Sequence, residues 1–490
     1  MHVLHVIMKE KINIAWLKRD LRTSDNLILD ACEREHIPYM IIYIFDPKII
    51  KADNISKRHL QFIYHSIKDM NRQLNTYNRS VKILYGSSIE ILREYLNSYD
   101  VKNIFAYQES GINDTYLRDI EIKKLSSENN IIFKEFEKDC VERGIRNRSG
   151  WDSRWYKKMN EGITKNKFTL NSLNDTITKF VPPKSFISGI SIYPEKHVKP
   201  GYVNAIKTLT TFLESRSQNY NKDLSKPFES RKSCSRISPY LSWGNISSKQ
   251  VYQFFKDHKK TKGIPAFLMR LKWRSHFIQK FESEHQISYR CANKAFEKME
   301  YKNDSSLINK WKNAQTGFPL VDANMICLKK TGWINFRMRA MLVSIFSYQF
   351  DCNWKLGASH LAQLFLDYEP GIHYSQFQMQ SGTTGINTIR MYNPIKQSYD
   401  HDPNGIFIKK WIPELRNVPL EYIHEPWKMP PLINTLSKDS IYNNPCVDIA
   451  ETGKAARSKI WSFKASKEVK KENKRILHLH VRNNNRSAQR

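Results

Sequence analysis

The stretch that decides the fold runs from Trp311 to Leu415. It reads WKNAQTGFPLVDANM at 311–325, TGWINFRMRAM at 331–341, NWKLGASHLAQLFLDYEPGIHYSQFQMQSG at 353–382 and IRMYNPIKQSYDHDPNGIFIKKWIPEL at 389–415. In this half of the chain, apolar residues recur at three- and four-residue spacing, as in 249–256, 264–281 and 336–350. That spacing places apolar side chains on one face of a helix, so it predicts an all-helical region from about residue 206.

Five short apolar runs, rich in β-branched and aromatic residues, punctuate the N-terminal part of the chain. They are INIAWL (12–17), YMIIYIF (39–45), VKILY (81–85), KNIFAY (102–107) and IIFKEF (131–136). Helix-length polar segments such as 57–77 and 88–98 separate them. Strands that alternate with helices predict a doubly wound parallel sheet. The predicted fold is therefore an α/β domain followed by an all-α domain.

These patterns predict four segments: an α/β domain at 11–150, a linker at 151–205, a helical domain at 206–430 and a basic C-terminal extension at 431–490. The linker is predicted because residues 160–205 carry Pro, Gly and Ser without clear periodicity. The chain ends in KEVKKENKRILHLHVRNNNRSAQR, which is mostly basic and polar. This end is either a disordered nucleic-acid-binding arm or an inert charged tail.

The chain is strongly basic, with 79 Lys and Arg against 48 Asp and Glu, a formal net charge of +31. This excess favours a polyanionic partner such as nucleic acid, although a protein from a generally basic proteome would carry the same signature. The run YMIIYIF is far too short to span a membrane, and MHVLHVIM at the start lacks the apolar core of a signal peptide. Seven cysteines without a CxxC pair indicate a reducing, intracellular, cytoplasmic setting and no metal site.

The order and separation of the blocks in 311–415 resemble the flavin-binding helical core of the photolyase/cryptochrome family. INIAWLKRDLRTSDNLIL (12–29) is similar to the opening strand and loop of the same family. The resemblance covers most of 11–430, with 160–205 poorly matched, and DYEPGIHYSQFQM (367–379) is closest to the DASH cryptochromes. It implies an FAD in the helical domain, a monomer that acts on UV-damaged DNA, single- or double-stranded, and a folate or deazaflavin antenna in the α/β domain.

The family holds the FAD pyrophosphate with a segment that SCSRISPYL (233–241) resembles. A diphosphate needs hydroxyls, backbone N–H groups and positive charge, which this segment offers. Cys234 stands where the family usually has Thr, which puts one hydroxyl contact in doubt. The alternative for the two spaced serines is ordinary helix capping. The predicted FAD-binding residues are Tyr220, Cys234, Ser235, Arg236, Ile237, Ser238, Arg339, Asp367, Glu369 and His373.

Arg339 and Asp367 are separated by twenty-eight residues, as are the Arg and Asp that pair beside the isoalloxazine in many family members. The resemblance implies that Arg339 stabilises negative charge on reduced flavin and that Asp367 holds Arg339, whereas the alternative is a plain interhelical salt bridge. Glu369 takes the place of a second family acid, near the pyrimidine edge. His373 falls where the family faces flavin N5, a position with Asn in photolyases and Asp in plant cryptochromes. It either donates to N5 or titrates near neutral pH, or it points elsewhere while a backbone group contacts N5.

Three aromatic residues conduct electrons to the flavin in the family. By spacing, the inner position falls on Phe377, the middle one on Trp354 and the outer one on Tyr301. Phe is a very poor electron donor, so the usual relay is broken at its first step. Either another Trp (333 or 311) substitutes, or the flavin is reduced externally. The alternative for Trp354 is core packing.

The family's lesion pocket is altered in this chain. Trp273 matches the first stacking Trp, Arg270 stands at the Glu position, and Met379 stands at the second Trp position. The Asn and Met positions fall on Phe336 and Ala340, as do the paired histidines of (6-4) photolyases. Arg270 either binds the phosphate between the lesion bases or a different anion. In the α/β domain, the candidate antenna residues at the strand ends are Arg19, Asp20, Arg22, Tyr107, Gln108 and Glu109.

Two main functions remain open at this point, beside a third reading, a non-photochemical flavoprotein that binds nucleic acid. The first is a blue-light-driven photolyase, a carbon–carbon lyase that splits pyrimidine dimers by electron transfer from reduced FAD. The second is a cryptochrome-like photoreceptor that binds FAD and nucleic acid without repair. The net charge of +31 and Trp273 favour repair, whereas the altered pocket favours the photoreceptor.

Overall fold

The computed structural model describes residues 9–481, apart from 171, 172, 174 and 176. The expectations for MHVLHVIM and for residues 482–490 lie outside this range. The chain forms two compact units that are not continuous in sequence. Unit 1 comprises residues up to 141, 154–209 and 237–257, and unit 2 comprises 142–153, 210–236 and the chain from 258 onward.

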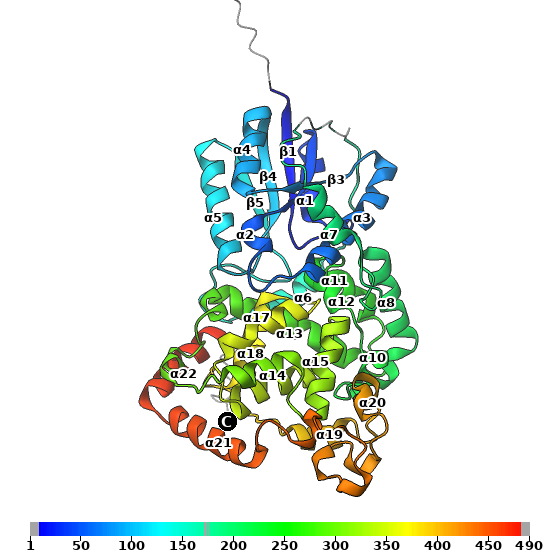
Figure 1. Cartoon of the computed structure of the whole chain (residues 1–490). Coiled ribbons are helices and arrows are strands. Elements are labelled where there is room, and N and C mark those ends of the chain that lie inside the picture. Colours follow the sequence, from blue (N-terminus) through cyan, green and yellow to red (C-terminus); the bar gives the residue numbers. More distant parts are fainter. Residues whose placement is uncertain (1–8, 171–172, 174, 176, 482–490) are drawn as a thin grey trace, which may run out of the picture. The chain divides into compact units, whose positions relative to one another are not determined.

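The centre of unit 1 is a parallel sheet with the strand order β3-β2-β1-β4-β5 (Figure 1). The strands are β1 (Lys11–Leu17), β2 (Tyr39–Phe45), β3 (Val81–Tyr85), β4 (Asp100–Tyr107) and β5 (Ile132–Phe136). All five predicted strands are confirmed, and the chain winds outward from β1 in both directions. The order reverses between β1 and β4, and a sheet of this kind binds ligands beyond the carboxyl ends of such strands.

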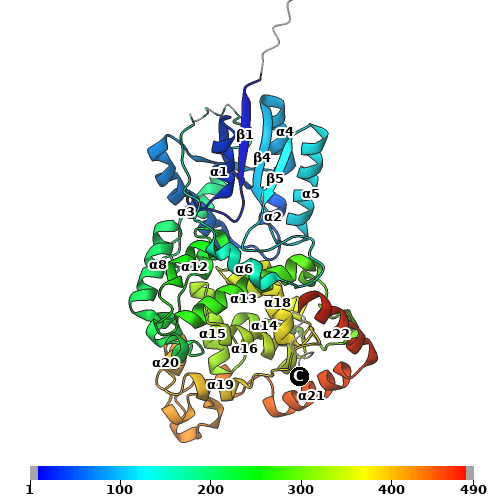
Figure 2. The same ribbon diagram turned by 180° about the vertical axis from the view of Figure 1, so that it is seen from behind.

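Helices cover both faces of the sheet, as Figures 1 and 2 show from opposite sides. The helices α4 (Ser88–Ser98) and α5 (Asn113–Glu128) lie on one face, and α1 (Leu27–Arg34) and α3 (Lys57–Leu74) lie on the other. Alternate residues of β1 form one core with α4 and α5: Ile12, Ile14 and Trp16 from the strand, Ile91, Leu92 and Tyr95 from α4, and Ile122 and Leu125 from α5. The period of two in the strand explains why only these side chains reach that face.

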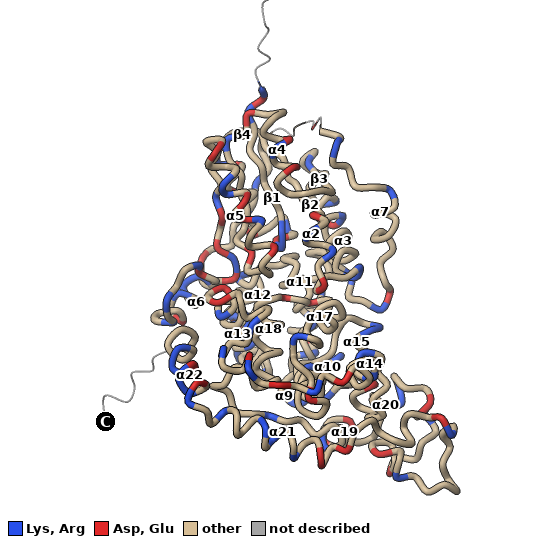
Figure 3. The backbone as a smooth tube through the Cα atoms, turned by 60° about the vertical axis from the view of Figure 1, so that its left-hand side comes forward, with Lys and Arg blue, Asp and Glu red and all other residues tan. Residues whose placement is uncertain are grey.

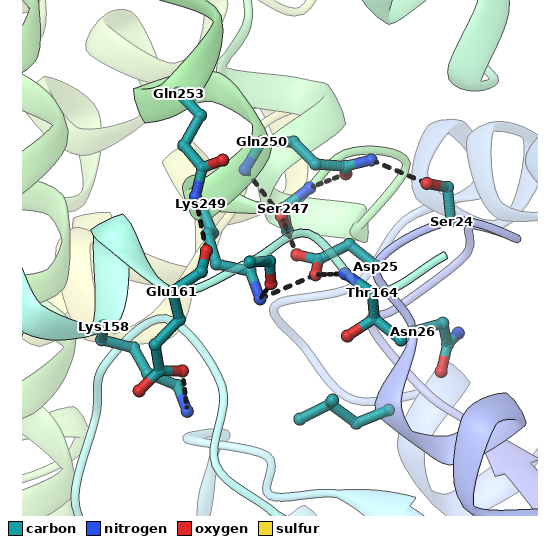
Figure 4. A network of polar contacts seen from close by, with 12 residues as sticks. Ser24, Asp25, Asn26, Lys158, Glu161, Thr164, Ser247, Lys249, Gln250 and Gln253 are labelled. Atoms are coloured by element: carbon teal, nitrogen blue, oxygen red, sulfur yellow. Dashed lines mark hydrogen bonds and ion pairs between the residues drawn. The ribbon is translucent and has the colours of Figure 1, made fainter. Parts of the chain in front are cut away.

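Asp25 ties a distant helix into unit 1 (Figure 4). Its Oδ1 accepts the Thr164 N–H at 3.1 Å and lies 2.8 Å from the Lys249 ammonium, while its Oδ2 accepts the Ser247 hydroxyl at 2.6 Å. Ser247 also caps α12 (Ser248–Lys256) by accepting the Gln250 N–H. These contacts explain why α11 (Ser238–Trp243) and α12 cluster with unit 1, although the helical pattern of the sequence begins before them.

The remaining helices of unit 1 include segments for which the sequence indicates no regular structure. Residues 151–205, the predicted linker, contain α6 and α7 and the start of α8. The bounds are α2 (Pro47–Ile50), α6 (Trp151–Asn160), α7 (Lys184–Ser191) and α8 (Tyr202–Glu214), of which α6 and α8 have residues in both units.

Unit 2 is helical, as predicted for the second half of the chain. Its helices before residue 431 are α9 (Tyr220–Asp223), α10 (Ser230–Ser233), α13 (Ile264–Ser283), α14 (Ser305–Asn313), α15 (Pro319–Thr331), α16 (Phe336–Ser344), α17 (Trp354–Leu364), α18 (Pro370–Ser381), α19 (Pro394–His401) and α20 (Ile406–Trp411). The central packing joins α13 and α16 to α18, and a single π-helical turn, Ile345–Gln349, extends α16. Among the described residues, no helix combines the length and apolarity that crossing a bilayer requires.

The basic C-terminal extension is not the irregular tail that its composition suggests. It forms α21 (Ile449–Lys464) and α22 (Lys467–His480), along which Lys and Arg recur (Figure 3). Val469, Ile476 and His480 are buried on one face of α22, and Arg475 pairs with Glu284 at 2.9 Å. The expectation of disorder is therefore wrong up to His480, because seven- and four-residue spacing of three side chains suffices to anchor a largely charged helix.

Asp322 organises the loop before α15. Its Oδ1 accepts the Thr316 N–H at 3.0 Å and the Thr316 hydroxyl at 2.8 Å, and its Oδ2 accepts the Gly317 N–H at 3.0 Å. The carboxyl group is fully buried and also hydrogen-bonds Tyr442, from the segment before α21. One side chain thus joins two parts of unit 2 that are far apart in sequence.

Replacing Asp322 with Ala should lower the free energy of unfolding by about 3 kcal/mol or more. The reason is that the change leaves several buried donors without partners, each costing about 1–3 kcal/mol. Urea unfolding followed by circular dichroism measures the change. Asp304→Ala, which removes the exposed cap of α14, is the matched control and should cost only about 1 kcal/mol. Equal costs for the two variants would contradict the assigned role of Asp322.

Candidate functional site

A bidentate ion pair lies at the centre of unit 2. The Arg339 Nη1 and Nη2 donate to Asp367 Oδ1 and Oδ2 at 3.1 and 2.9 Å, and the Arg339 Nε donates to the Ile334 carbonyl at 2.9 Å. The Asp367 side chain is 4 % exposed, whereas that of Arg339 is 29 % exposed. The carboxylate thus holds the guanidinium through both of its oxygens, and part of the Arg339 side chain stays exposed.

Two further arginines converge on Trp333 without a carboxylate between them. The guanidinium carbon of Arg236 lies 4.0 Å from the centre of the Trp333 ring, and that of Arg231 lies 5.8 Å from it. The Arg236 Nε is buried and has no hydrogen-bond partner among the described residues. Burial, followed by the nearby charge of Arg231, lowers the pKa of Arg236 to about 9. Such an arginine is suited to an anionic ligand.

The backbone around Arg236 adopts an unusual conformation. Arg236 has a φ of +58°, in the left-handed region. Arg216 fixes the preceding residues by donating to the carbonyls of Cys234 and Ser235. A non-glycine residue in this region is uncommon, and strain of this kind concentrates at ligand sites. The sequence gives no signal for Arg216 or for Trp333 as supports of this segment.

The other predicted residues of this segment lie close along the chain. Cys234 is buried, and burial raises the pKa of its thiol to about 12, so the thiol is neutral. Tyr220 is also buried, with its ring edge-on to Phe212 at 5.6 Å. Ile237 is buried and Ser238 begins α11, both within unit 1. The predicted pyrophosphate-binding role of these residues stays a prediction.

Glu369 has a partner that the sequence does not reveal. Its Oε2 accepts a hydrogen bond from the Arg274 Nη2 at 3.0 Å, and both side chains are under a tenth exposed. Arg274 lies on α13, 95 residues away in sequence. No local pattern could have found this pair, because only the packing of α13 against α18 brings it together.

His373 lies among aromatic rings on α18. Its Nε2 donates to the Ala358 carbonyl at 2.9 Å, and its ring is within 5.2–6.2 Å of four aromatic rings: Phe365, Tyr368, Tyr374 and Phe377. Burial lowers the pKa of His373 to about 4. This lowered pKa argues against the alternative that the imidazole titrates near neutral pH, and the predicted contact with flavin N5 stays a prediction. At pH 7 it is neutral, with its one N–H directed at a backbone carbonyl.

The predicted relay residues Phe377 and Trp354 are neighbours. Their ring centres are 6.3 Å apart, and Phe377 lies 5.6 Å from His373 on its other side. Trp354 is 1 % exposed and Phe377 is 2 % exposed. Tyr301 is covered by Lys459 of α21, whose ammonium lies 5.0 Å from the phenol ring centre and pairs with Asp351 at 2.6 Å. Burial raises the pKa of Tyr301, with a contribution from Cys291.

Trp333 and Trp311, the two alternative tryptophans for the relay, have surroundings that differ from those of Trp354 and Phe377. Trp333 packs against the two guanidinium groups, and positive charge next to an indole opposes its oxidation. Trp311 is fully buried, its indole N–H donates to the Leu342 carbonyl, and its ring lies 4.6 Å from Phe346.

An exposed platform combines aromatic rings with positive charge on α13 and α16. Trp273 is 48 % exposed and Phe336 is 40 % exposed. The guanidinium of Arg270 lies between them, 5.2 Å from the Trp273 ring and 5.1 Å from the Phe336 ring, and Arg337 lies 5.2 Å from Phe336. We call Arg270, Trp273, Phe336 and Arg337 the aromatic platform. Exposed aromatic rings beside cations suit nucleic-acid bases and phosphates.

Two other positions of the predicted lesion pocket are less informative. Ala340 is buried on α16, and Met379 is partly exposed on α18. These helices pack against each other, so both residues belong to the same part of unit 2. The platform is therefore the element of the pocket that the structure describes best.

The carboxyl ends of the strands of unit 1 form an apolar pocket closed by ion pairs. Tyr43, Ile50, Leu60, Ile63 and Trp243 line it, together with Arg19, Glu109 and Arg118. Glu109 pairs with Arg118 at 2.8 Å and with Arg19 at 3.3 Å. Although burial opposes it, these cations lower the pKa of Glu109 to about 2. The strand-end residues Arg19 and Glu109 are thus brought together as the α/β rule predicts.

The other strand-end residues lie beside this pocket or behind it. Arg22 donates to the Tyr107 hydroxyl at 3.3 Å, and both line a second pocket with Asp25. Asp20 is fully buried and accepts the Lys18 N–H at 2.8 Å, and burial raises the pKa of its carboxyl group. Gln108 donates its backbone N–H to the Phe136 carbonyl. These residues build the edge rather than face the apolar pocket.

The residues of unit 2 fit FAD on chemical grounds. Arg236 has a buried nitrogen without a partner and an excess of positive charge around it, which a phosphate satisfies. Arg339 presents a fixed, partly open guanidinium, which suits the electron-rich edge of a reduced flavin. The donor set is therefore compatible with both ends of the cofactor.

Comparison with known proteins gives two family matches. Residues 13–157 match the family described as DNA photolyase, and residues 267–462 match the FAD binding domain of DNA photolyase. A deoxyribodipyrimidine photo-lyase of Alkalihalophilus pseudofirmus is 25 % identical over 92 % of this chain and 98 % of its own. One from Buchnera aphidicola is 27 % identical over 91 % of this chain and 96 % of its own.

Solved structures show the same fold. A bacterial class III photolyase from Agrobacterium tumefaciens aligns with a TM-score of 0.82 at 19 % identity, covering 95 % of this chain and all of that one. An archaeal photolyase from Sulfolobus tokodaii with two FAD molecules aligns with a TM-score of 0.79 at 22 % identity, covering 92 % of this chain and all of that one.

Replacing Arg339 with Ala should weaken FAD binding by at least about tenfold, because it removes the cation and deprives the buried Asp367 of its arginine partner. Release of FAD fluorescence on dilution measures the effect. Arg143→Ala is the matched control, since Arg143 pairs with Glu282 at 2.6 Å with a similar pattern of exposure, 26 % and 5 %. The control should lower stability but retain FAD. Equal retention in both variants would place the Arg339–Asp367 pair away from the flavin.

Proposed function

Because the chain belongs to the photolyase/cryptochrome family, we propose that it is a blue-light-driven DNA photolyase that splits UV-induced pyrimidine dimers. The aromatic platform is the observation that carries this proposal. A flipped dimer needs a stacking surface and a cation for its phosphate, and Trp273 with Arg270 offers both. The net charge of +31 supports a DNA partner, and Lys and Arg are spread over both units (Figure 3).

The proposed cofactor site assigns a task to each group. Arg236, with Ser235 and Tyr220, holds the pyrophosphate, and Arg339 with Asp367 keeps positive charge beside the isoalloxazine. Reduced FAD, when bound and excited by blue light, supplies the electron that splits the dimer. The residues around it need no general acid or base. They hold the cofactor and the lesion in position and exclude water.

The proposed route for photoreduction starts at Trp354. Its ring is separated from His373 by Phe377, which cannot itself be oxidised easily. Tyr301 is a poor donor for a different reason, since the Lys459 ammonium over its ring opposes positive charge there. Trp354 is therefore the donor in this proposal, with Phe377 acting only as packing in between.

The apolar pocket of unit 1 is proposed to hold the antenna chromophore. Its walls are aliphatic and aromatic, and its charges are already paired, so it suits a flat, largely apolar ring. A folate and a deazaflavin both contain such a ring.

One observation favours the second candidate, a cryptochrome-like photoreceptor. Arg270 occupies the position at which the photolyases that this chain resembles carry Glu. A carboxylate that would contact the lesion is therefore replaced by a cation. A photoreceptor needs FAD and photoreduction but no lesion pocket. Light-dependent dimer repair separates the two candidates.

The purified, prereduced holoprotein should repair cyclobutane dimers in an oligonucleotide under blue light and not in the dark. Trp273→Ala should weaken binding of the dimer by about tenfold, because stacking contributes about 1–3 kcal/mol per base. Recovery of the pyrimidine base absorbance on repair and a binding titration measure the two effects.

Trp461→Ala is the matched control, because Trp461 on α21 is also exposed, at 56 %. This variant should bind the dimer like the unaltered protein. Absence of light-dependent repair in the holoprotein would reject the photolyase proposal, and equal weakening by both substitutions would reject the platform.

Photoreduction of the oxidised holoprotein with an external thiol should be slow, and Phe377→Trp should accelerate it. The reason is that Trp is far easier to oxidise than Phe, so the substitution shortens the first electron jump. The larger ring could cost about 1–3 kcal/mol of stability through overpacking. Flavin absorbance under continuous blue light measures the rate, and Trp354→Phe in the Phe377→Trp background should abolish the gain. A gain that survives Trp354→Phe would show that a different aromatic path operates.

A further inference from the structure

A chain of hydrogen bonds leads from the proposed electron donor to the surface. The Trp354 Nε1–H donates to the Cys291 Sγ at 3.4 Å. Trp354 is 1 % exposed and Cys291 is 5 % exposed, so the indole N–H has no route to water of its own. Cys291 lies after α13, 63 residues from Trp354, and only the tertiary packing of unit 2 brings the two side chains together.

Glu297 continues the chain. Its carboxylate lies beside Cys291 and contributes to the raised pKa of the thiol, and its Oε1 accepts the Cys291 backbone N–H at 2.5 Å. Its Oε2 lies 2.7 Å from the Lys355 ammonium, and both of these side chains are 35 % exposed. The chain therefore begins at a buried indole and ends at a carboxylate in contact with solvent.

We propose that Cys291 and Glu297 conduct the indole proton of Trp354 to the surface when Trp354 gives up an electron. This inference rests on the proposed photoreduction through Trp354. An oxidised indole is a strong acid at nitrogen, and loss of its proton prevents the electron from returning. The proton path thus keeps the electron transfer from reversing.

The step balances with the groups present. Trp354 loses one electron to the photoexcited oxidised flavin, and its Nε1–H bond breaks as that proton moves to the Cys291 Sγ. The original S–H proton of Cys291 moves to a Glu297 carboxylate oxygen. The products are a neutral indole radical, an unchanged thiol and a protonated Glu297, which exchanges its proton with water. An external thiol later returns one electron and one proton to Trp354.

The protonation states at rest suit this direction of transfer. Burial raises the pKa of the Cys291 thiol to about 12, so the thiol carries the proton that it must pass on. The Lys355 ammonium and the bond from the Cys291 N–H lower the pKa of Glu297 although burial opposes this, so at neutral pH the carboxylate is ionised and free to accept. A hydrogen-bonded chain of this kind transfers protons without large motion.

The positive charge should remain on Trp354 long enough for the proton to leave, because both neighbouring positions of the relay are poor electron donors. Inward, Phe377 is a poor donor. Outward, Tyr301 lies beneath the Lys459 ammonium, which Asp351 fixes in place. Deprotonation of Trp354 therefore competes mainly with return of the electron.

Laser-flash absorption of the oxidised holoprotein tests the path, because the radical cation and the neutral radical of Trp have different spectra. Cys291→Ala and Glu297→Gln should each slow formation of the neutral radical by roughly tenfold or more. Cys291→Ser keeps a hydroxyl that can accept and donate, so it should stay near the rate of the unaltered protein. The rate should also fall in D2O, except in Cys291→Ala.

The ground state offers a readout that needs no flavin. The S–H stretching band of Cys291, identified by its loss in Cys291→Ser, should shift when Glu297→Gln removes the carboxylate acceptor. An unshifted band would show that the thiol does not donate to Glu297 and would overturn the path.

Two further outcomes overturn the inference. The first is an unchanged deprotonation rate in Cys291→Ala, which would mean that the proton leaves by another route. The second is the absence of any Trp354 radical, shown by identical flash spectra in Trp354→Phe. Dimer repair by prereduced Cys291→Ala is a separate measurement and should equal that of the unaltered protein. Failure of repair in both proteins with normal flash kinetics rejects the photolyase function alone.

Discussion

The gathering of partly buried arginines around Trp333 and Asp367 is the constraint on which the helical unit depends. Arg231, Arg236 and Arg339 converge there, yet Asp367 is already committed to Arg339 in a bidentate pair. The pKa of Arg236, lowered to about 9, reflects what this arrangement costs without a further anion. Bringing like charges together in a partly desolvated region costs free energy, and an anionic ligand would offset that cost.

The strand edge of the α/β unit follows the opposite principle. Its cations are matched, since Glu109 pairs with Arg19 and Arg118, and Asp119 lies 2.8 Å from Lys18. The adjoining pocket is consequently apolar in character although charged residues surround it. The chain therefore has two kinds of site. The first would attract an anionic ligand, and the lining of the second would suit a flat apolar ring.

The sequence predicts what is local and misses what is long-range. The strands were predictable because short β-branched runs such as YMIIYIF have one dominant structure, and the helical unit was predictable from apolar spacing. The Arg339–Asp367 pair was predictable only because the separation of two residue types resembles a known family. The Arg274–Glu369 pair, the packing of Arg236 on Trp333 and the anchoring of α22 have no such signal, because each depends on helices that meet only in the folded unit. His373 shows a further limit: its residue type indicates titration near neutral pH, whereas burial among four rings sets its pKa near 4.

The surroundings of the aromatic series explain why a sulfur atom becomes important in this chain. In a relay of good donors, positive charge moves outward to water and loses its proton there. In the proposed relay the inner ring is Phe377, and the outer ring, Tyr301, is covered by Lys459, so charge on Trp354 would be held in the interior. A buried cation is costly unless it loses a proton, and the only hydrogen bond of the Trp354 indole among the described residues is that to Cys291. Under this proposal the positive charge cannot move further outward, so proton release would occur at Trp354 itself, and Cys291, Glu297 and Lys355 would supply the exit from that point.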